Sequence, residues 1–559
     1  MNPADPNELQ RTAAAPDASA WVAASAGSGK TKVLSDRVLN LLLNGTPPEK
    51  ILCLTFTRTA AAEMANRVTE ILSKWATAED DVLERDLESL SGKAPKPSEK
   101  EKARCLFARL LDAPGGINIM TIHGFCQSLL KRFPLEAGVS PQFDVLDEQG
   151  TLELMEQAEE ETLANPAFAK DLDLIALMTD DKGFSDLLKE LSFFKNDLEA
   201  LLSQYPKGDA LKSEYERVLG LPNDATQESL IAEFCRPDDK RKADLKKAAE
   251  ILIAGKSVSV RENGEIIKSF VNADENKRIE SCFDYLTCFL TKDLTSIRKR
   301  LTNKDSAAAQ EIMQNEAERA LKLHNDLNAE TVLRGSLALS GIGMQIIKRY
   351  DELKKERSVA DYDDLISAAR RLLEKSGAAA WVLFKLDGGI EHILVDEAQD
   401  TSPEQWAVVK SLAEEFFSGE GASKAKRTVF AVGDKKQSIY SFQGADPDEF
   451  ERMRAFFRQK ATNARQAWHD VPMYISFRST PAVIEAVNRT LKNPVAARGV
   501  VDEGEDATHL SWRKGEAGLV EIWPTEKTKT DDTPQMYTKP VEQIVVKNAS
   551  SRLAGKNAK

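Results

Sequence analysis

The sequence predicts an α/β fold with a parallel sheet into which a helical block is inserted. WVAASAGSGKTKVL (21–34) runs from an apolar segment through small residues into an amphipathic one, which is the order strand, loop, helix. ILCLTFT (51–57) and RTAAAEMANRVTEIL (58–72) repeat that order, and EHILVDEAQD (391–400) adds an apolar run that ends in acidic residues. Alternating strands and helices are typical of a parallel sheet that binds ligands at the carboxyl ends of its strands.

The bulk composition limits the class of protein. With 559 residues the chain exceeds a single core, and 42% hydrophobic with 30% charged residues is typical of a soluble globular protein. The net charge of −13 excludes a generally basic surface, so any nucleic-acid contact is confined to a local groove. The six cysteines lack C-x-x-C spacing and indicate neither a zinc site nor a disulfide framework, so we expect a cytoplasmic protein.

The loop after the first strand has the composition of a phosphate-binding loop. Small residues let successive backbone N–H groups point at phosphate oxygens, and the following helix directs its positive end at them. Lys30 is expected to contact the β- and γ-phosphates of ATP, and Thr31 to ligate Mg²⁺. Because Ala24 replaces the usual glycine, a Gly/Ser turn before an ordinary helix is the alternative. The expected ATP-binding loop comprises Ala24, Ser25, Ala26, Gly27, Ser28, Gly29, Lys30 and Thr31.

The next segments continue the α/β pattern. Residues 76–105 are charged and end in helix breakers, which predicts a peripheral insertion with an exposed loop. INIMTI (117–122) predicts a third strand, and His123 follows at its junction with a helix. A lone histidine there is more often a structural hydrogen-bonding residue than a catalyst.

Residues 150–345 have a helical pattern almost throughout. The exception is SVSVRENGEIIKS (257–269), which predicts a β-hairpin around ENG. The basic clusters at 236–247 and 292–304 are either solvated helix faces or nucleic-acid contacts. Residues 346–375 predict a further helix that contains DYDDL.

The acidic strand end supplies the groups that a phosphate site lacks. An aspartate such as Asp396 can hold Mg²⁺ at a strand end, and the neighbouring Glu397 can polarise the water that attacks a γ-phosphate. Since this pair follows ILV in a chain with a phosphate-binding loop, it favours nucleotide hydrolysis over a chance pair of surface acids.

Two later strands end in further candidates. RTVFAVGDKKQSIYSFQGAD (427–446) places Gln437 where it can sense a γ-phosphate. Tyr440 and Phe442 alternate with small polar residues, either as platforms for bases or as core aromatics. VPMYISFRST (471–480) predicts a strand that places Arg478 on a loop.

These segments together resemble superfamily 1 helicases of the UvrD/Rep type, and among them the AddA family, helicase–nuclease subunits that work with AddB in bacterial double-strand break repair. The resemblance spans most of residues 10–480, on WVAASAGSGKT, ILCLTFTRTAAAEMANR, IMTIHGFCQSLL, ILVDEAQDTSPEQW, VGDKKQSIYSFQGADP and FRST. It implies a P-loop RecA-like domain 1A at 1–149 and 346–470, a mostly helical inserted domain 1B at 150–345, and the start of a second RecA-like domain, 2A, at 471–559.

The resemblance also implies a role for each candidate. Gln10, which the residues alone favour as a surface glutamine, would recognise adenine. Lys30 and Thr31 would hold phosphates and Mg²⁺, with Asp396 on the metal and Glu397 as general base. Contacts with the γ-phosphate would come from Gln437 and Arg478, and the single-strand track would be lined by Thr55, Phe56, Thr57, His123, Tyr440 and Phe442.

The implied activity is ATP-dependent 3′ to 5′ movement on DNA. The implied partners are single-stranded DNA, double-stranded DNA ends and an AddB-like subunit in a heterodimer, and no membrane is involved. The sequence departs from the family pattern at Gln443 and Ser476, where arginine and asparagine are usual.

A larger departure concerns residues 480–559, where we find neither of the two further second-domain motifs nor the nuclease motif. We therefore expect an N-terminal portion that binds ATP but hydrolyses it poorly, since an arginine finger contributes roughly 10³–10⁵ in rate. The alternative is a non-catalytic module that occupies ATP, DNA or AddB. A P-loop small-molecule kinase is disfavoured, because it leaves the pairing of DEAQD with GDKKQSIY unexplained.

Overall fold

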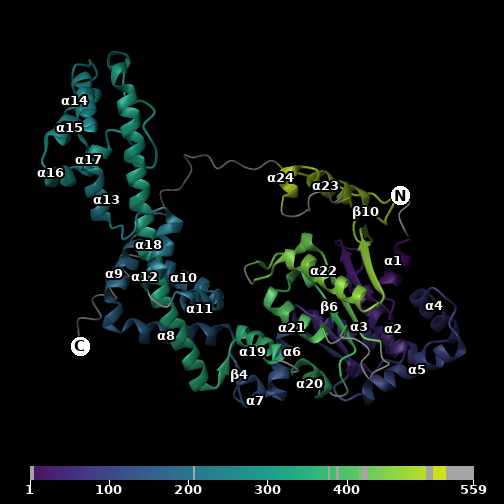
Figure 1. Cartoon of the computed structure of the whole chain (residues 1–559). Coiled ribbons are helices and arrows are strands. Elements are labelled where there is room, and N and C mark those ends of the chain that lie inside the picture. The colour runs from purple at the N-terminus through teal and green to yellow at the C-terminus, as the bar shows by residue number, and fades with distance from the viewer. Residues whose placement is uncertain are drawn as a thin grey trace, which may run out of the picture. The chain divides into compact units, whose positions relative to one another are not determined.

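The computed structural model describes residues 5–205, 208–375, 378–385, 389–414, 416–417, 426–441, 444–498 and 508–523. The chain divides into two compact units, of which unit 1 is Met1–Ala137 with Ile366–Lys559 and unit 2 is Gly138–Leu365 (Figure 1). None of the described helices combines the length and the apolar character that a bilayer span requires. All six cysteines are free thiols, as the sequence predicts.

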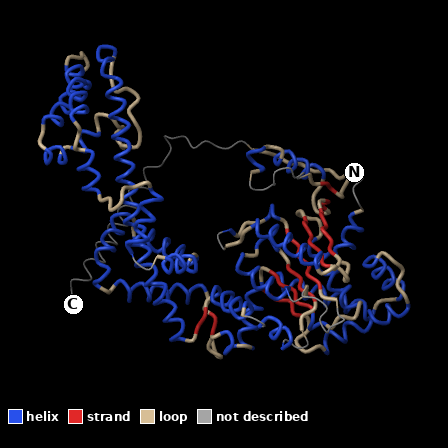
Figure 2. The backbone as a smooth tube through the Cα atoms, viewed as in Figure 1, coloured by secondary structure: helices blue, strands red, loops and turns tan. Residues whose placement is uncertain are grey.

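Unit 1 is built on a parallel sheet, which confirms the predicted α/β class. Its six strands lie in the order β3-β2-β6-β7-β1-β8, and every adjacent pair is parallel (Figure 2). Because β2, β6 and β7 are buried at every residue, they are continuous apolar runs rather than alternating ones. The strands are β1 (Ser19–Ala24), β2 (Ile51–Thr55), β3 (Asn118–Thr121), β6 (His392–Val395), β7 (Thr428–Gly433) and β8 (Trp468–Met473).

Successive residues of β1 pack into two different layers. Val22 belongs to a core formed with α2, α3, α4 and α5. Trp21 instead stacks with Trp406 of α21 at 5.7 Å and contacts Phe450 of α22 at 4.8 Å between ring centroids. The helices of unit 1 are α1 (Pro6–Ala13), α2 (Lys30–Leu43), α3 (Arg58–Thr77), α4 (Asp80–Ser91), α5 (Pro97–Asp112), α6 (Ile122–Arg132), α7 (Pro134–Ala137), α20 (Ala378–Lys385), α21 (Pro403–Glu414), α22 (Pro447–Asn463), α23 (Pro481–Leu491) and α24 (Pro494–Ala497).

The charged stretch 76–105 is less peripheral than the sequence suggests. It forms α4 and the first part of α5, whose Leu83, Leu87 and Leu106 join the same buried core as β1. Only the short link between the two helices, residues 92–96, matches the predicted exposed loop. The prediction of a peripheral insertion is therefore wrong, because leucines at helical spacing pack onto α2 and α3.

The last strand of the sheet also begins earlier than expected. β8 pairs with β1 from Trp468 to Met473, so the predicted domain boundary at 471 falls inside this strand. The next short strand, β9 (Ile475–Ser476), leaves the sheet and pairs with β10 (Leu510–Ser511).

Unit 2 is helical and contains α18 (Gln310–Arg357), a helix of 48 residues. One part of α18 packs in a core with Leu154 and Ala158 of α8, and another part in a core with Leu245 of α14 and Ile267 of α15. The other elements of unit 2 are α8 (Glu148–Leu163), α9 (Ala169–Met178), α10 (Asp181–Phe193), α11 (Lys195–Gln204), α12 (Gly208–Leu219), α13 (Gln227–Phe234), α14 (Asp239–Ile253), α15 (Val258–Asn272), α16 (Glu275–Glu280), α17 (Cys282–Leu286), β4 (Asp144–Val145) and β5 (Val359–Ala360).

Two predictions in and beside this unit are wrong. The expected hairpin at 257–269 is helix α15, whose buried residues Val260, Gly264 and Ile267 recur at helical rather than strand spacing. The expected helix 346–375 is interrupted, because α18 ends before Ser358, which has φ 52°, and α19 (Tyr362–Glu374) begins after a short strand.

Candidate nucleotide site

The phosphate-binding loop joins β1 to α2 in the predicted geometry. Gly27 has φ +76° and Gly29 has φ +92°, a region that glycine adopts without strain. A Cβ atom on Gly27 would lie 2.7 Å from both the Arg478 Cβ and the Ser476 Oγ. Gly27 therefore allows the segment that carries Arg478 to lie directly against the loop. Although it departs from the family pattern, Ser476 contributes to this close packing.

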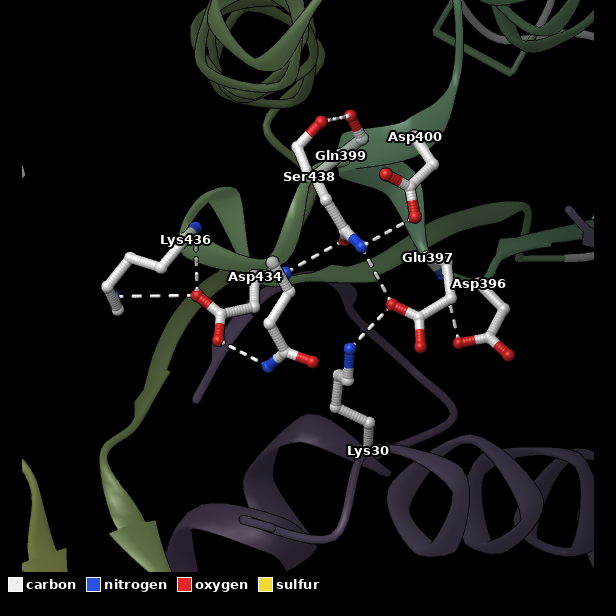
Figure 3. A network of polar contacts seen from close by, with 9 residues as sticks. Lys30, Asp396, Glu397, Gln399, Asp400, Asp434, Lys436 and Ser438 are labelled. Carbon is white, nitrogen blue, oxygen red and sulfur yellow. Dashed lines mark hydrogen bonds and ion pairs between the residues drawn. The ribbon is translucent and has the colours of Figure 1, made fainter. Parts of the chain in front are cut away.

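The structure brings Lys30 and Glu397 together from positions 367 residues apart. The Lys30 Nζ donates to the Glu397 Oε2 at 2.5 Å, and the two side chains are 12% and 37% exposed (Figure 3). Lys30 is the first residue of α2, and Glu397 follows β6 with φ 46°, which is unusual for a residue other than glycine. Backbone strain of this kind persists where the surroundings hold a residue in place, and it is common at functional sites.

The acidic groups beside this pair share an electrostatic environment. Burial, and then the charge of Glu397, raises the pKa of Asp396 to about 6. The same two causes, in the same order, raise the pKa of Asp400 to about 6. A cation relieves both the desolvation and the repulsion of such carboxylates, and carboxylate with hydroxyl oxygen is a donor set that Mg²⁺ accepts. The Asp396 carboxylate and the hydroxyl of Thr31, the second residue of α2, thus fit a magnesium site.

The loop after β7 reaches the same region. Gln437 lies in the short 3₁₀ helix η5 (Lys435–Gln437), and its Nε2 donates to the Asp434 Oδ2 at 2.5 Å. The Asp434 Oδ1 accepts from the Lys436 backbone N–H at 3.2 Å, which caps the turn. The chain of polar contacts in Figure 3 continues from Asp434 through Gln399 to Glu397. Sequence reasoning missed Gln399, because its partner Asp434 belongs to another strand and no local pattern marks the contact.

Gln10 is buried, with 4% exposure, so its interpretation as a surface glutamine is wrong. Its Nε2 donates to the Ser28 carbonyl at 3.2 Å, and its Oε1 accepts from the Lys32 Nζ at 3.2 Å. Gln10 also lines a small pocket with Phe477, which the sequence reasoning missed although it directly precedes Arg478. The other residues that line this pocket are Pro6, Leu9, Ser28, Met473, Tyr474 and Ile475.

The aromatic candidates for the DNA track lie together in part. The rings of Phe56, after β2, and Tyr440, after η5, are 4.5 Å apart between centroids, and both side chains are half-buried rather than core residues. Phe442 lies outside the described residues.

The remaining track candidates differ in what they present. Thr55 is buried, and its hydroxyl donates to the Thr57 carbonyl at 3.0 Å. Thr57 is exposed, and its hydroxyl caps α3 by accepting from the Ala60 N–H. Burial, and then the charge of Arg58, lowers the pKa of His123. His123 is therefore neutral near pH 7, and it lies in the first turn of α6.

Comparison with known families agrees with this geometry. The UvrD/REP helicase N-terminal domain family matches residues 6–458, which carry all the site residues named above except those in and after β8. The chain belongs to the UvrD/REP helicase family. Like the other superfamily 1 helicases that it resembles, this UvrD/REP chain has its phosphate-binding loop and its acidic strand on one parallel sheet.

Similar proteins within the UvrD/REP group are named as the A component of an ATP-dependent helicase/nuclease. The proteins from Lactobacillus gasseri and Exiguobacterium sibiricum are each 26% identical to the chain, over 85% and 92% of its length. The protein from Clostridium perfringens is 27% identical over 89% of the chain. These matches cover 38%, 42% and 39% of the respective relatives, so the chain spans about two fifths of their length.

Proposed function

We propose that this chain is the ATP-binding motor part of a superfamily 1 DNA helicase that moves 3′ to 5′ and acts in double-strand break repair and homologous recombination. The contact between Lys30 and Glu397 carries the proposal, because it joins a phosphate-binding loop to a candidate general base. The names of the relatives support the assignment to an AddA-like protein.

In this proposal the nucleotide lies along the loop between β1 and α2. Lys30 and the backbone N–H groups of residues 24–31 bind the phosphates, and Glu397 takes a proton from the attacking water. Mg²⁺, held by Thr31 and Asp396, would neutralise charge on the phosphates. The γ-phosphate is contacted by Gln437 and Arg478, and adenine lies between the amide of Gln10 and the ring of Phe477.

The single strand is proposed to cross the ends of β2 and β3. Phe56 and Tyr440 offer ring faces on which bases stack, a contact that tolerates any sequence. Thr57 and His123 contribute polar contacts, while the buried Thr55 supports the turn. Phe442 belongs to the same proposed track. The proposed partners are single-stranded DNA, double-stranded DNA ends and an AddB-like subunit.

We propose further that the isolated chain binds ATP but turns it over slowly, since residues 480–559 contain no second-domain arginine motif. A non-catalytic module that occupies ATP, DNA or an AddB-like subunit is the second candidate, favoured by the same observation. Calorimetric ATP binding and steady-state hydrolysis, with and without single-stranded DNA and with Lys30→Ala as the blank, test both. Failure of the wild-type chain to bind ATP refutes the motor proposal, and strong DNA-stimulated hydrolysis refutes slow turnover.

A further inference from the structure

Gln399 lies at the centre of the polar network in Figure 3. It belongs to the short 3₁₀ helix η4 (Ala398–Asp400) directly after β6, and it is only 1% exposed. Its Nε2 donates to the Glu397 Oε2 at 2.8 Å and to the Asp400 Oδ2 at 3.0 Å. Its Oε1 accepts from the backbone N–H of Asp434 at 2.8 Å. Both ends of the amide are thus engaged, with carboxylates on one side and the end of β7 on the other.

These contacts form one continuous path across the site. From Glu397 the path passes through Gln399 to Asp434, whose Oδ2 accepts from the Gln437 Nε2 at 2.5 Å. The Ser438 hydroxyl closes a second link by donating to the Gln399 carbonyl at 3.3 Å. The segment with the candidate γ-phosphate sensor is therefore held by the residue two positions after the candidate base.

The packing leaves little freedom for this connection. A Cβ on Gly433 would lie 2.6 Å from the Gln399 Oε1 and 3.2 Å from the Gln399 backbone nitrogen. The end of β7 thus approaches η4 at a distance that glycine alone allows. A carboxylate in place of the amide would add a third negative group beside Glu397 and Asp400 and remove the donors that both accept from. The site therefore requires an uncharged side chain with a donor and an acceptor end.

We propose that Gln399 is a positioning residue that aligns Gln437 with Glu397, so that discrimination of ATP from ADP depends on this amide. The proposal rests on the proposed function, in which Gln437 contacts the γ-phosphate. A buried polar network acts as a unit, and removing one member leaves its neighbours unsatisfied. Losing Gln399 therefore releases Gln437 although the sensor side chain itself is intact.

The test measures the affinities of the whole 559-residue chain for ATPγS and ADP with Mg²⁺ by calorimetry. Wild type is expected to prefer ATPγS, and Gln437→Ala to reduce that preference roughly tenfold, as expected for one hydrogen bond to a charged group. Gln399→Leu and the isosteric Gln399→Glu are expected to reduce it by a similar factor. Combining Gln399→Glu with Gln437→Ala should add little, because both changes break the same path.

Gln405→Leu is the matched control, because Gln405 is a buried glutamine of α21 that accepts from the Ser402 N–H outside the path. Its preference should equal that of wild type, and melting temperatures identify any variant that fails to fold. A wild-type chain without preference for ATPγS overturns the proposed function. A preference that is lost in Gln437→Ala but kept in Gln399→Glu overturns the positioning role alone, as does an equal loss in Gln405→Leu.

Discussion

Replacing Glu397 with glutamine should tighten ATP binding by this chain. The Lys30 Nζ contacts the Glu397 Oε2 at 2.5 Å, so any phosphate that Lys30 binds competes with this carboxylate for the ammonium group. Glutamine keeps the shape and one acceptor oxygen but removes the charge. It also removes repulsion between the carboxylate and a bound γ-phosphate, which acts in the same direction. The same variant should hydrolyse no ATP if Glu397 is the general base.

The exposure of the two side chains limits the size of the effect. Solvent-exposed ion pairs contribute about 0.2–1 kcal/mol, and two unit charges 4 Å apart at an effective dielectric of 20 interact by about 4 kcal/mol. Lys30 is 12% exposed but Glu397 is 37% exposed, so solvent screens the pair in part. We therefore expect a gain of about 1–2 kcal/mol, or a dissociation constant roughly 5–30-fold lower.

Calorimetry with ATPγS and Mg²⁺ measures this change without depending on turnover. Glu391→Gln is the control, because Glu391 pairs with Lys50 at 2.7 Å just before β6, at the strand end opposite Glu397. That variant should bind nucleotide like wild type. Unchanged or weaker binding by Glu397→Gln, with an unaffected control, would falsify the competition argument.

Three further predictions concern the loop and the cores. Gly27→Ala should abolish nucleotide binding, because a Cβ would meet Arg478 at 2.7 Å at φ +76°, and calorimetry that shows normal binding would contradict this. Burial, and then Arg37, lowers the pKa of His392 to about 3; since the unfolded chain binds that proton near 6.5, urea-unfolding stability should fall below pH 6.5 by up to about 1.4 kcal/mol per unit, and His392→Gln should remove this slope. Glu316→Ala should destabilise unit 2 by about 3–5 kcal/mol in denaturant titrations, because Arg241 would keep a buried charge without its partner, and an unchanged midpoint would refute this.

The sequence predicts best those parts of the site that are contiguous in the chain. The phosphate-binding loop and the Asp396–Glu397 pair are read from local order, since each consists of an apolar strand with its functional residues directly after it. Local patterns fail where tertiary packing decides. The β-branched residues before ENG favour a hairpin, yet Val260 and Ile267 are buried on one helix face of unit 2.

Residues that act through distant partners escape sequence reasoning for a different reason. Gln10 is a polar residue in a polar segment, and only its contacts with Ser28 and Lys32 account for its burial. Gln399 meets Asp434 because β6 pairs with β7, a pairing that one sequence does not reveal. Their chemistry is ordinary for glutamine, so strand order rather than residue type identifies them.

The strand register explains why the site converges at one edge of the sheet. Ala23 pairs with Gly433 and Val395 pairs with Ala431, so the loops after β1, β6 and β7 begin side by side. The six-stranded sheet fixes these starting points, while side-chain contacts between the loops fix the rest. Substitutions at the loop contacts should therefore alter nucleotide binding more than they alter the stability of unit 1.

The loop after β7 has a special place in this arrangement. It carries Asp434 and Gln437 on the phosphate side and, three residues later, Tyr440, whose ring contacts Phe56 after β2. A displacement of Gln437 thus reaches the aromatic pair along the backbone of one short segment, whereas the sheet beneath has strands buried at every residue and resists movement. If nucleotide and DNA are coupled in this chain, we expect residues 434–440 rather than the sheet to carry the coupling.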